Sequence, residues 1–322
     1  MISLPDFKEK QILFVNTDWN TPAHLRFYND NIVFEKDRKV VNRVSVHKTF
    51  AIFICGDLSF TTGFIKQAKE HGISVFLLKH NFEMYGGLMT VAEGHYVLRM
   101  KQYALTGEQE LQMAKKLVAN KIANQVSVLN KRKLSEEEKI KIYTAHGESG
   151  RDIETVASND SLLGIEGNFS RLYFQTQFKD MEWRRRAPRT KEDTNNFFMD
   201  MGYTLLFNFV DSLLRLHGFD TYKGFYHKLF FQRRSLACDI MEPMRPLIDH
   251  QIVKMHNLGQ IKKEDFVMAN GGFALPVEFY PKYAGIFLQC LMDHKEEIFQ
   301  YVHNYYRYMM DPEKNVFPTF NI

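Results

Sequence analysis

The sequence predicts an α+β protein in which a small N-terminal β domain, residues 1–90, precedes a larger all-helical domain, residues 91–322. Three observations predict this fold class. The chain has 322 residues, which exceeds the roughly 100 to 200 of one typical domain. Short apolar runs fill the first ninety residues. After Glu93 the apolar residues instead recur every three or four positions, which is the helical period.

The N-terminal part contains six short segments rich in valine, isoleucine and phenylalanine, separated by asparagine, aspartate and glycine. Such segments are typical of β-strands, because branched and aromatic side chains fit a pleated surface. Strands are predicted over 11–15, 25–28, 31–34, 43–46, 50–55 and 74–78. Before the last of these, Phe64, Ile65 and Ala68 share one side of a helical pattern that ends at Gly72, so a helix is predicted over 61–71.

The C-terminal part shows the spacing of long amphipathic helices, which we predict over 108–133, 195–216 and 281–309. Two segments lack this spacing. Residues 134–152 are charged and contain two glycines, and residues 184–194 contain a proline. We expect both to be irregular connections.

The composition, 45% hydrophobic and 25% charged residues, is that of an ordinary globular protein and excludes collagen-like and broadly disordered chains. No run reaches the roughly 18 apolar residues of a membrane span, and the N-terminus is charged, so we expect a cytoplasmic protein without a membrane partner. Three widely spaced cysteines exclude a disulfide framework and a Cys-x-x-Cys zinc site. A net charge of +4 is too small to indicate a nucleic-acid partner by itself.

A carboxylate stands out in the helical part, because Glu166 lies between Gly164 and Gly167. Asp160 or Ser161 can cap its helix. Glycine destabilises a helix by about 1 kcal/mol relative to alanine, so two glycines suggest that another backbone or a ligand approaches this face closely. The alternative is a surface glutamate that stabilises the helix dipole.

A second acidic segment follows. Ser235 is a plausible cap for a helix in which Asp239 and Glu242 share one face, and Pro243 would bend that helix or leave a free carbonyl near Asp239. His227 precedes this segment. Taken singly, two carboxylates on a helix are usually solvent-facing, and a lone histidine usually belongs to a core or a surface.

Together, carboxylates and an imidazole suit a divalent cation such as Mg²⁺ or Mn²⁺. Basic residues cluster nearby, over 171–191 with Trp183 among them and at Arg233 and Arg234. Acidic metal ligands within basic, aromatic-containing sequence are what phosphodiester chemistry requires, since arginines hold phosphates while a cation stabilises charge. A solvated surface is the alternative reading of the arginines.

At these segments the sequence resembles the CRISPR-associated integrase of spacer acquisition, the universal first protein of CRISPR adaptation. Residues 164–167, followed by Tyr173 and Phe174, resemble the first metal-ligand motif of that family, and residues 235–246 resemble its second acidic motif. His227 stands where the family histidine does. Further similarity lies at 121–125, 202–206, Gly56-Asp57, and Asp265-Phe266 followed by Gly271-Gly272.

The resemblance implies a catalytic role for the helical domain and dimerisation or DNA contact for the β domain. It implies that Glu166, His227 and Glu242 bind Mg²⁺ or Mn²⁺ and that Asp239 orients or supplements that shell. The 3′ hydroxyl of new spacer DNA would attack the CRISPR repeat by transesterification. Implied partners are double-stranded DNA, a second copy of the chain and a small second CRISPR-associated protein. The implied DNA-binding residues are Lys121, Arg171, Arg184, Arg185, Arg186, Arg189, Arg233, Arg234 and Arg245.

Two departures from the family pattern concern local contacts. Asp200 and Met201 stand where an asparagine and a tyrosine are common, and residues 230–232 replace a Gly-Arg-Pro turn. Two other functions remain open. The same site would serve a structure-specific, metal-dependent nuclease that uses water, and a catalytically silent nucleic-acid-binding module would need no intact Glu, His and Glu set.

Overall fold

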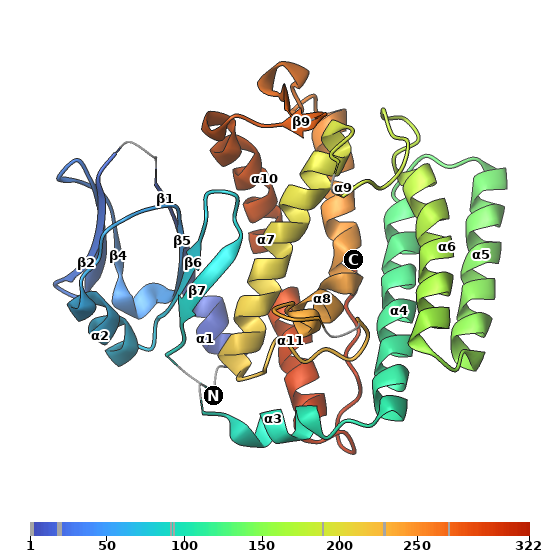
Figure 1. Ribbon diagram of the computed structural model, residues 1–322, viewed down its shortest axis with the longest axis horizontal. Coiled ribbons are helices and arrows are strands. Elements are labelled where there is room, and N and C mark those ends of the chain that lie inside the picture. The colour runs from blue at the N-terminus through green and yellow to red at the C-terminus, as the bar shows by residue number, and fades with distance from the viewer. Residues whose placement is uncertain are drawn as a thin grey trace. The chain divides into compact units, whose positions relative to one another are not determined.

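The computed structural model describes residues 3–17, 21–90, 92, 94–188, 190–227, 230–269 and 271–322. The chain divides into two compact units, whose elements are labelled in Figure 1. The first unit consists of Met1–Met100 with Asp211–Asp220, and the second of Lys101–Val210 with Thr221–Ile322. The long helix α7 (Thr194–His217) therefore contributes residues to both units.

The first unit contains a four-stranded and a three-stranded sheet. Its strands are β1 (Gln11–Asn16), β2 (Ala23–Tyr28), β3 (Asn31–Lys36), β4 (Lys39–Ser45), β5 (Thr49–Cys55), β6 (Ser74–Leu78) and β7 (Met84–Leu88). The larger sheet has the order β1-β5-β6-β7, in which β1, β5 and β6 are parallel and β7 is antiparallel to β6. Strands β2, β3 and β4 form an antiparallel meander.

The short helical elements of this unit are α1 (Leu4–Glu9), η1 (Val46–Lys48) and α2 (Thr62–Glu70). Every residue of β5 is buried, as is typical of a strand covered on both faces. Leu25, Ile52, Phe64 and Val75 belong to one apolar core that joins both sheets and α2. The six predicted strands and the predicted helix are confirmed within one to three residues at each end. Strand β7 was not predicted, because its two glycines weaken the strand signal.

The rest of the chain is mainly helical. The helices are α3 (Tyr96–Tyr103), α4 (Gly107–Leu129), α5 (Glu136–Thr155), α6 (Asn159–Gln177), α7, α8 (Ser235–Met241), α9 (Arg245–Asn257), α10 (Tyr280–Asp293) and α11 (Lys295–Met310), with short turns η2 (Glu242–Met244), η3 (Lys263–Asp265) and η4 (Val277–Phe279). Helices α4, α5 and α6 pack side by side (Figure 1). A short hairpin of β8 (Val267–Ala269) and β9 (Gly272–Ala274) was not expected in a helical region.

Two predicted boundaries in this region are wrong. Residues 134–152 are not an irregular connection, because most of them form α5. Ser135 and Glu138 make a reciprocal capping box at its start, and Gly147 and Gly150 are accommodated in its interior. The helix predicted over 281–309 is divided at His294, whose backbone N–H bonds to Leu291 and ends α10.

Two predicted helix caps are also wrong. Helix α6 is capped by Ser158, whose hydroxyl accepts the N–H of Ser161, and not by Asp160 or Ser161. Ser235 begins α8 but its buried hydroxyl has no partner in the described part of the chain, so it is not a cap. The irregular connection predicted over 184–194 is confirmed for its described residues. No helix among the described residues is both long and apolar enough to span a membrane.

Candidate active site

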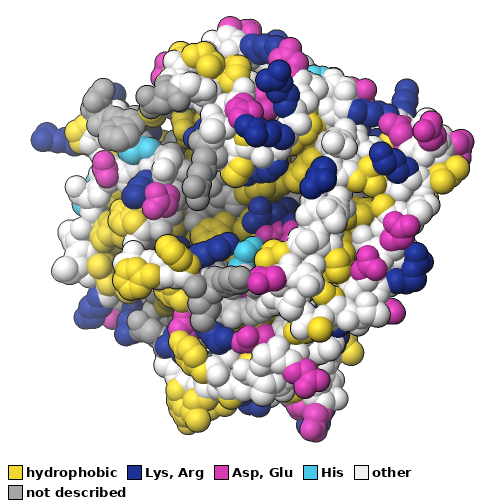
Figure 2. Space-filling view, turned by 45° about the vertical axis from the view of Figure 1, so that its right-hand side comes forward, with side chains coloured by type: hydrophobic (Ala, Val, Ile, Leu, Met, Phe, Trp, Pro, Cys, Tyr) yellow, Lys and Arg dark blue, Asp and Glu magenta, His cyan; other side chains and the backbone are white. Residues whose placement is uncertain are grey.

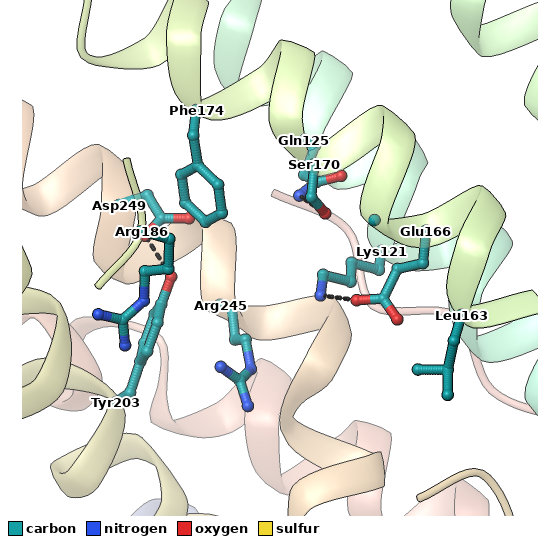
Figure 3. A pocket seen from close by; sticks show the side chains of 11 residues that line it. Lys121, Gln125, Leu163, Glu166, Ser170, Phe174, Arg186, Tyr203, Arg245 and Asp249 are labelled. Carbon is teal, nitrogen blue, oxygen red and sulfur yellow. Dashed lines mark hydrogen bonds and ion pairs between the residues drawn. The ribbon is translucent and has the colours of Figure 1, made fainter. Parts of the chain in front are cut away.

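An open pocket in the helical unit is lined by side chains from α4, α6, α7, α9 and the segment before α7. The lining residues are Lys121, Gln125, Leu163, Glu166, Gly167, Ser170, Phe174, Arg186, Tyr203, Arg245 and Asp249. Figure 3 shows Lys121 and Glu166 facing each other on one side and Tyr203 beside Asp249 on the other. Figure 2 shows basic, acidic and histidine side chains together in the hollowed centre of one face. The pocket therefore combines opposite charges.

Glu166 lies in the second turn of α6, where it is largely covered. Its neighbours Leu162 and Phe169 are buried and fix that face of the helix against the unit. A Cβ atom added to Gly164 or Gly167 would meet nothing within 4 Å. The idea that another backbone approaches these glycines is therefore wrong. They instead leave open space beside the carboxylate.

Glu242 is placed by a break in the helix that carries the second acidic segment. Pro243 cannot donate a backbone hydrogen bond, so α8 ends at Met241 and the chain continues as the tight turn η2 before α9 begins. The carbonyl of Asp239 is bonded by the backbone N–H of Glu242. The predicted bend beside the acids is confirmed. It leaves Glu242 only 3% exposed.

Asp239 is fully buried and organises the loop that carries the histidine. Its Oδ2 accepts the N–H groups of Phe225 and Tyr226 at 2.7 and 3.1 Å, and its Oδ1 accepts the N–H of His227 at 2.9 Å. The His227 Nδ1 lies 2.6 Å from the same Oδ1. A side chain at Gly224 would come within 2.6 Å of Oδ2, so only glycine fits there.

This arrangement directs the other histidine nitrogen toward Glu242, with 3.8 Å between His227 Nε2 and Glu242 Oε1. A carboxylate on the far nitrogen is the usual support of a metal-binding histidine, because it fixes the tautomer and the ring orientation. Asp239 therefore orients His227. It is spent on these hydrogen bonds and does not face the pocket with the other acids.

Lys121 connects the two glutamates. Its ammonium donates to Glu166 Oε1 and, at 2.6 Å, to Glu242 Oε2. Burial opposes the charge, but Glu166 and Glu242 outweigh it and raise the pKa of Lys121. Burial likewise opposes ionisation of Glu242, but Arg245, Lys121 and His227 lower its pKa to about 2. Both members of this ion pair are charged at neutral pH.

Two groups of the site were missed in the sequence. Tyr226 donates its hydroxyl to Glu166 Oε2, and this contact together with burial raises its pKa far above the ordinary value. The only sequence signal was its position next to His227. Asp249 accepts the hydroxyls of Tyr203 at 2.5 Å and Tyr173 at 3.0 Å. Its signal was an acid one helical turn after Arg245 in an otherwise apolar helix.

Tyr203 also contacts two of the predicted DNA-binding arginines. The guanidinium carbons of Arg245 and Arg186 lie 4.8 and 5.6 Å from the centre of its ring. Arg245 additionally pairs with Glu242 at 2.9 Å, and Arg186 with Asp200 at 2.6 Å. Aromatic faces attract such cations, so the ring fixes both guanidinium groups beside the carboxylates.

The structure brings three of the predicted DNA-binding residues together, since Lys121, Arg186 and Arg245 line the pocket. It does not place the others there. Arg171, Arg184 and Arg233 are exposed elsewhere, Arg185 pairs with Glu192 at 2.6 Å, and Arg234 precedes α8. Arg189 lies outside the described residues.

The predicted metal ligands converge without forming a closed ligand set. Among the described residues, no three His, Cys, Asp or Glu side chains are gathered as a metal site would need. The reason at this site is the Lys121 ammonium, which lies between Glu166 and Glu242. The donor types nevertheless fit a divalent cation, because two carboxylates and an imidazole nitrogen held by Asp239 surround one point.

Comparison with known proteins agrees with these motifs. The family model of CRISPR associated protein Cas1 matches residues 19–287. The CRISPR-associated endonuclease Cas1 1 of Thermodesulfovibrio yellowstonii is 32% identical over 255 residues, which cover 72% of this chain and 78% of that protein.

Three solved structures share the fold. A CAS1 protein from Thermotoga maritima superposes with a TM-score of 0.78 at 19% identity, covering 94% of this chain and 97% of that one. A casposase bound to integration product gives 0.76 at 19% identity, covering 95% and 92%. A partial Cas6-RT-Cas1–Cas2 complex gives 0.73 at 23% identity, covering 97% and 98%. The family model and the relative confirm the predicted resemblance, and the chain belongs to the CRISPR associated protein Cas1 family.

Proposed function

We propose that this protein is a metal-dependent DNA integrase that inserts new spacer DNA into a CRISPR array by transesterification. One observation carries the proposal. Glu166, Glu242 and the Asp239-supported His227 converge at a pocket whose other polar lining includes Lys121, Arg186 and Arg245. Carboxylates for a cation and guanidinium groups for phosphates are the two requirements of phosphodiester transfer.

Glu166, His227 and Glu242 would hold Mg²⁺ or Mn²⁺. When bound, the cation supplies charge stabilisation at the scissile phosphate. The low pKa of Glu242 keeps one oxygen ligand ionised, and Asp239 leaves the His227 Nε2 available. These properties are set by the chain before any cation arrives.

The protein groups have separate tasks in the reaction. Arg245, seated on the Tyr203 ring, and Arg186 would hold the repeat phosphate by charge-assisted hydrogen bonds. The 3′ hydroxyl of the incoming strand forms a new phosphorus–oxygen bond, the existing bond to the repeat 3′ oxygen breaks, and that oxygen leaves as a hydroxyl. Close positioning of the two reactants supplies much of the acceleration.

Double-stranded DNA, as spacer precursor and as CRISPR repeat, is the proposed substrate. A homodimer assembled with a small second CRISPR-associated protein is the proposed working form. Two titles support this proposal, since one similar structure is a Cas1–Cas2 complex and another is a casposase bound to integration product. We also propose that residues 1–90 contribute to dimerisation or DNA contact and that residues 91–322 carry catalysis.

A joining assay tests the function. A labelled duplex with 3′ hydroxyl ends is incubated with a repeat-containing plasmid and Mn²⁺ or Mg²⁺, and we expect label in the plasmid with the parent protein and none with Glu166→Ala. The name endonuclease on the relative favours a second candidate, cleavage by water at the same site. Plasmid or branched DNA that is cut without incorporating label would establish that candidate, and DNA binding without either reaction would leave a binding module.

A further inference from the structure

Lys121 is unusual because a buried ammonium occupies the position between two proposed metal ligands. The side chain of Lys121 is 10% exposed, and those of Glu166 and Glu242 are 14% and 4% exposed. Unpaired charges are rarely buried, so the two carboxylates need a cation in this position. In the structure the lysine supplies it.

The backbone beneath Lys121 is fixed by its neighbours on α4. Asn124 donates to the carbonyl of Pro243 at 2.7 Å, directly after Glu242, and to that of Phe320 at 2.8 Å. Asn120 exchanges two hydrogen bonds with the backbone of Phe320, each 2.8 Å long. The helix is therefore tied to the segment that carries Glu242. Any rearrangement at the site must come from the flexible lysine side chain.

A second position for the ammonium lies one helical turn further along α4. The Nε2 of Gln125 donates to Ser170, but its Oε1 is buried without a hydrogen-bond partner among the described residues. Gln125 lines the same pocket as Lys121 and is drawn beside it in Figure 3. A buried acceptor without a donor is destabilising, and an ammonium at position i−4 could supply the donor.

We propose that Lys121 is the counterion of the metal-free site and competes with the divalent cation for Glu166 and Glu242, moving toward Gln125 when the cation binds. This inference rests on the proposed metal dependence of the enzyme. The physical reason is that the same carboxylate oxygens cannot serve both cations. An ammonium left between them would also repel the incoming ion.

Direct binding of Mn²⁺ to the full-length protein without DNA tests this competition. Free Mn²⁺ is measured by electron paramagnetic resonance for the parent, Lys121→Met, Lys121→Arg and Lys116→Met. Lys116 is an exposed lysine of the same helix, so its variant controls for the loss of one charge. We expect Lys121→Met to bind Mn²⁺ at least about tenfold tighter, since a repulsive charge is removed. The other two variants should bind like the parent.

Thermal stability gives a second readout that does not depend on catalysis. Without metal, Lys121→Met should melt at a lower temperature than the parent, because two buried carboxylates lose their counterion. Saturating Mn²⁺ should raise its melting temperature more than that of the parent. A variant that folds only with Mn²⁺ would support the proposal, and one that folds in neither condition would overturn it, as would equal or weaker Mn²⁺ binding by Lys121→Met.

The test separates this inference from the proposed function. If neither the parent nor Lys121→Met binds Mn²⁺ in a manner that Glu242→Ala removes, the metal site itself is wrong. If the parent binds Mn²⁺ through Glu242 and Lys121→Met gains nothing, only the competition is wrong. Gln125→Leu adds a check on the second position, because removal of the acceptor should weaken Mn²⁺ binding by the parent and leave Lys121→Met unchanged.

Discussion

Glu242 and Asp249 are both buried carboxylates of the helical unit, but their surroundings have opposite effects. Glu242 contacts the cations Lys121 and Arg245, which lower its pKa to about 2. Asp249 contacts two tyrosine hydroxyls, and burial raises its pKa to about 6 despite those hydrogen bonds and the more distant arginines. The partners of a carboxylate therefore decide its role here. Glu242 is kept ionised as a ligand, whereas Asp249 serves as a hydrogen-bonding anchor.

Removal of Glu242 should give the largest effect. We expect Glu242→Ala to abolish joining while duplex affinity stays roughly unchanged, because phosphate contacts are separate from metal ligation. Joining is measured with the labelled duplex and affinity by a salt titration without metal. Asp249→Ala provides the contrast, since its joining should fall only in proportion to lost stability. Equal loss of joining and affinity in Glu242→Ala would assign that residue a structural role.

The histidine should come next in the order of effects. His227→Ala should abolish or severely reduce joining with Mg²⁺ and with Mn²⁺. In the parent, Mn²⁺ should support joining at least as well as Mg²⁺ and Ca²⁺ should not, since imidazole suits Mn²⁺ and Ca²⁺ prefers more oxygens at longer distance. Full Mg²⁺-supported joining by His227→Ala would leave a carboxylate-only site.

Asp239 should show a smaller loss because it acts through His227. We expect Asp239→Asn to reduce Mn²⁺ affinity or joining by about 10- to 100-fold, the range reported for groups that support a metal-binding histidine. Four hydrogen bonds end on this side chain, so circular dichroism and a melting curve must accompany the assay. A variant that folds, binds Mn²⁺ and joins DNA like the parent would remove Asp239 from the site.

The anchor should instead reveal itself in the pH dependence of stability. The pKa of Asp249 is raised from 3.8 to about 6 in the folded protein, so its contribution is complete below pH 3.8 and is lost as the pH rises through 6. Each pKa unit corresponds to about 1.4 kcal/mol, which gives a loss of roughly 3 kcal/mol. Urea unfolding of the parent and Asp249→Asn at pH 4 and 7 measures it. A difference that does not change with pH would refute this carboxyl as the cause.

Much of this arrangement could be predicted from the sequence, and the missing parts share a cause. Strands and long helices follow from local periodicity, which each segment carries in itself. Glu166, His227 and Glu242 were identified because glycines, a proline and motif similarity mark them. The roles of Lys121, Tyr226 and Asp249 could not be predicted, because each depends on a partner from another element. Helix α5 was missed because its charged residues and glycines hid a sound capping box.

The smallest effect should come from the ring that joins the two carboxylate environments. Tyr203→Phe keeps the contacts with Arg245 and Arg186 and loses only the hydrogen bond to Asp249, whereas Tyr203→Leu loses the aromatic face. Cation–π contacts contribute about 0.5 to 2 kcal/mol each, so Tyr203→Leu should weaken DNA affinity by roughly 3- to 30-fold. Tyr203→Phe should retain affinity but lose stability, because a buried hydrogen bond is gone. Equal affinity in both variants would show that the arginines are held by Glu242 and Asp200 alone.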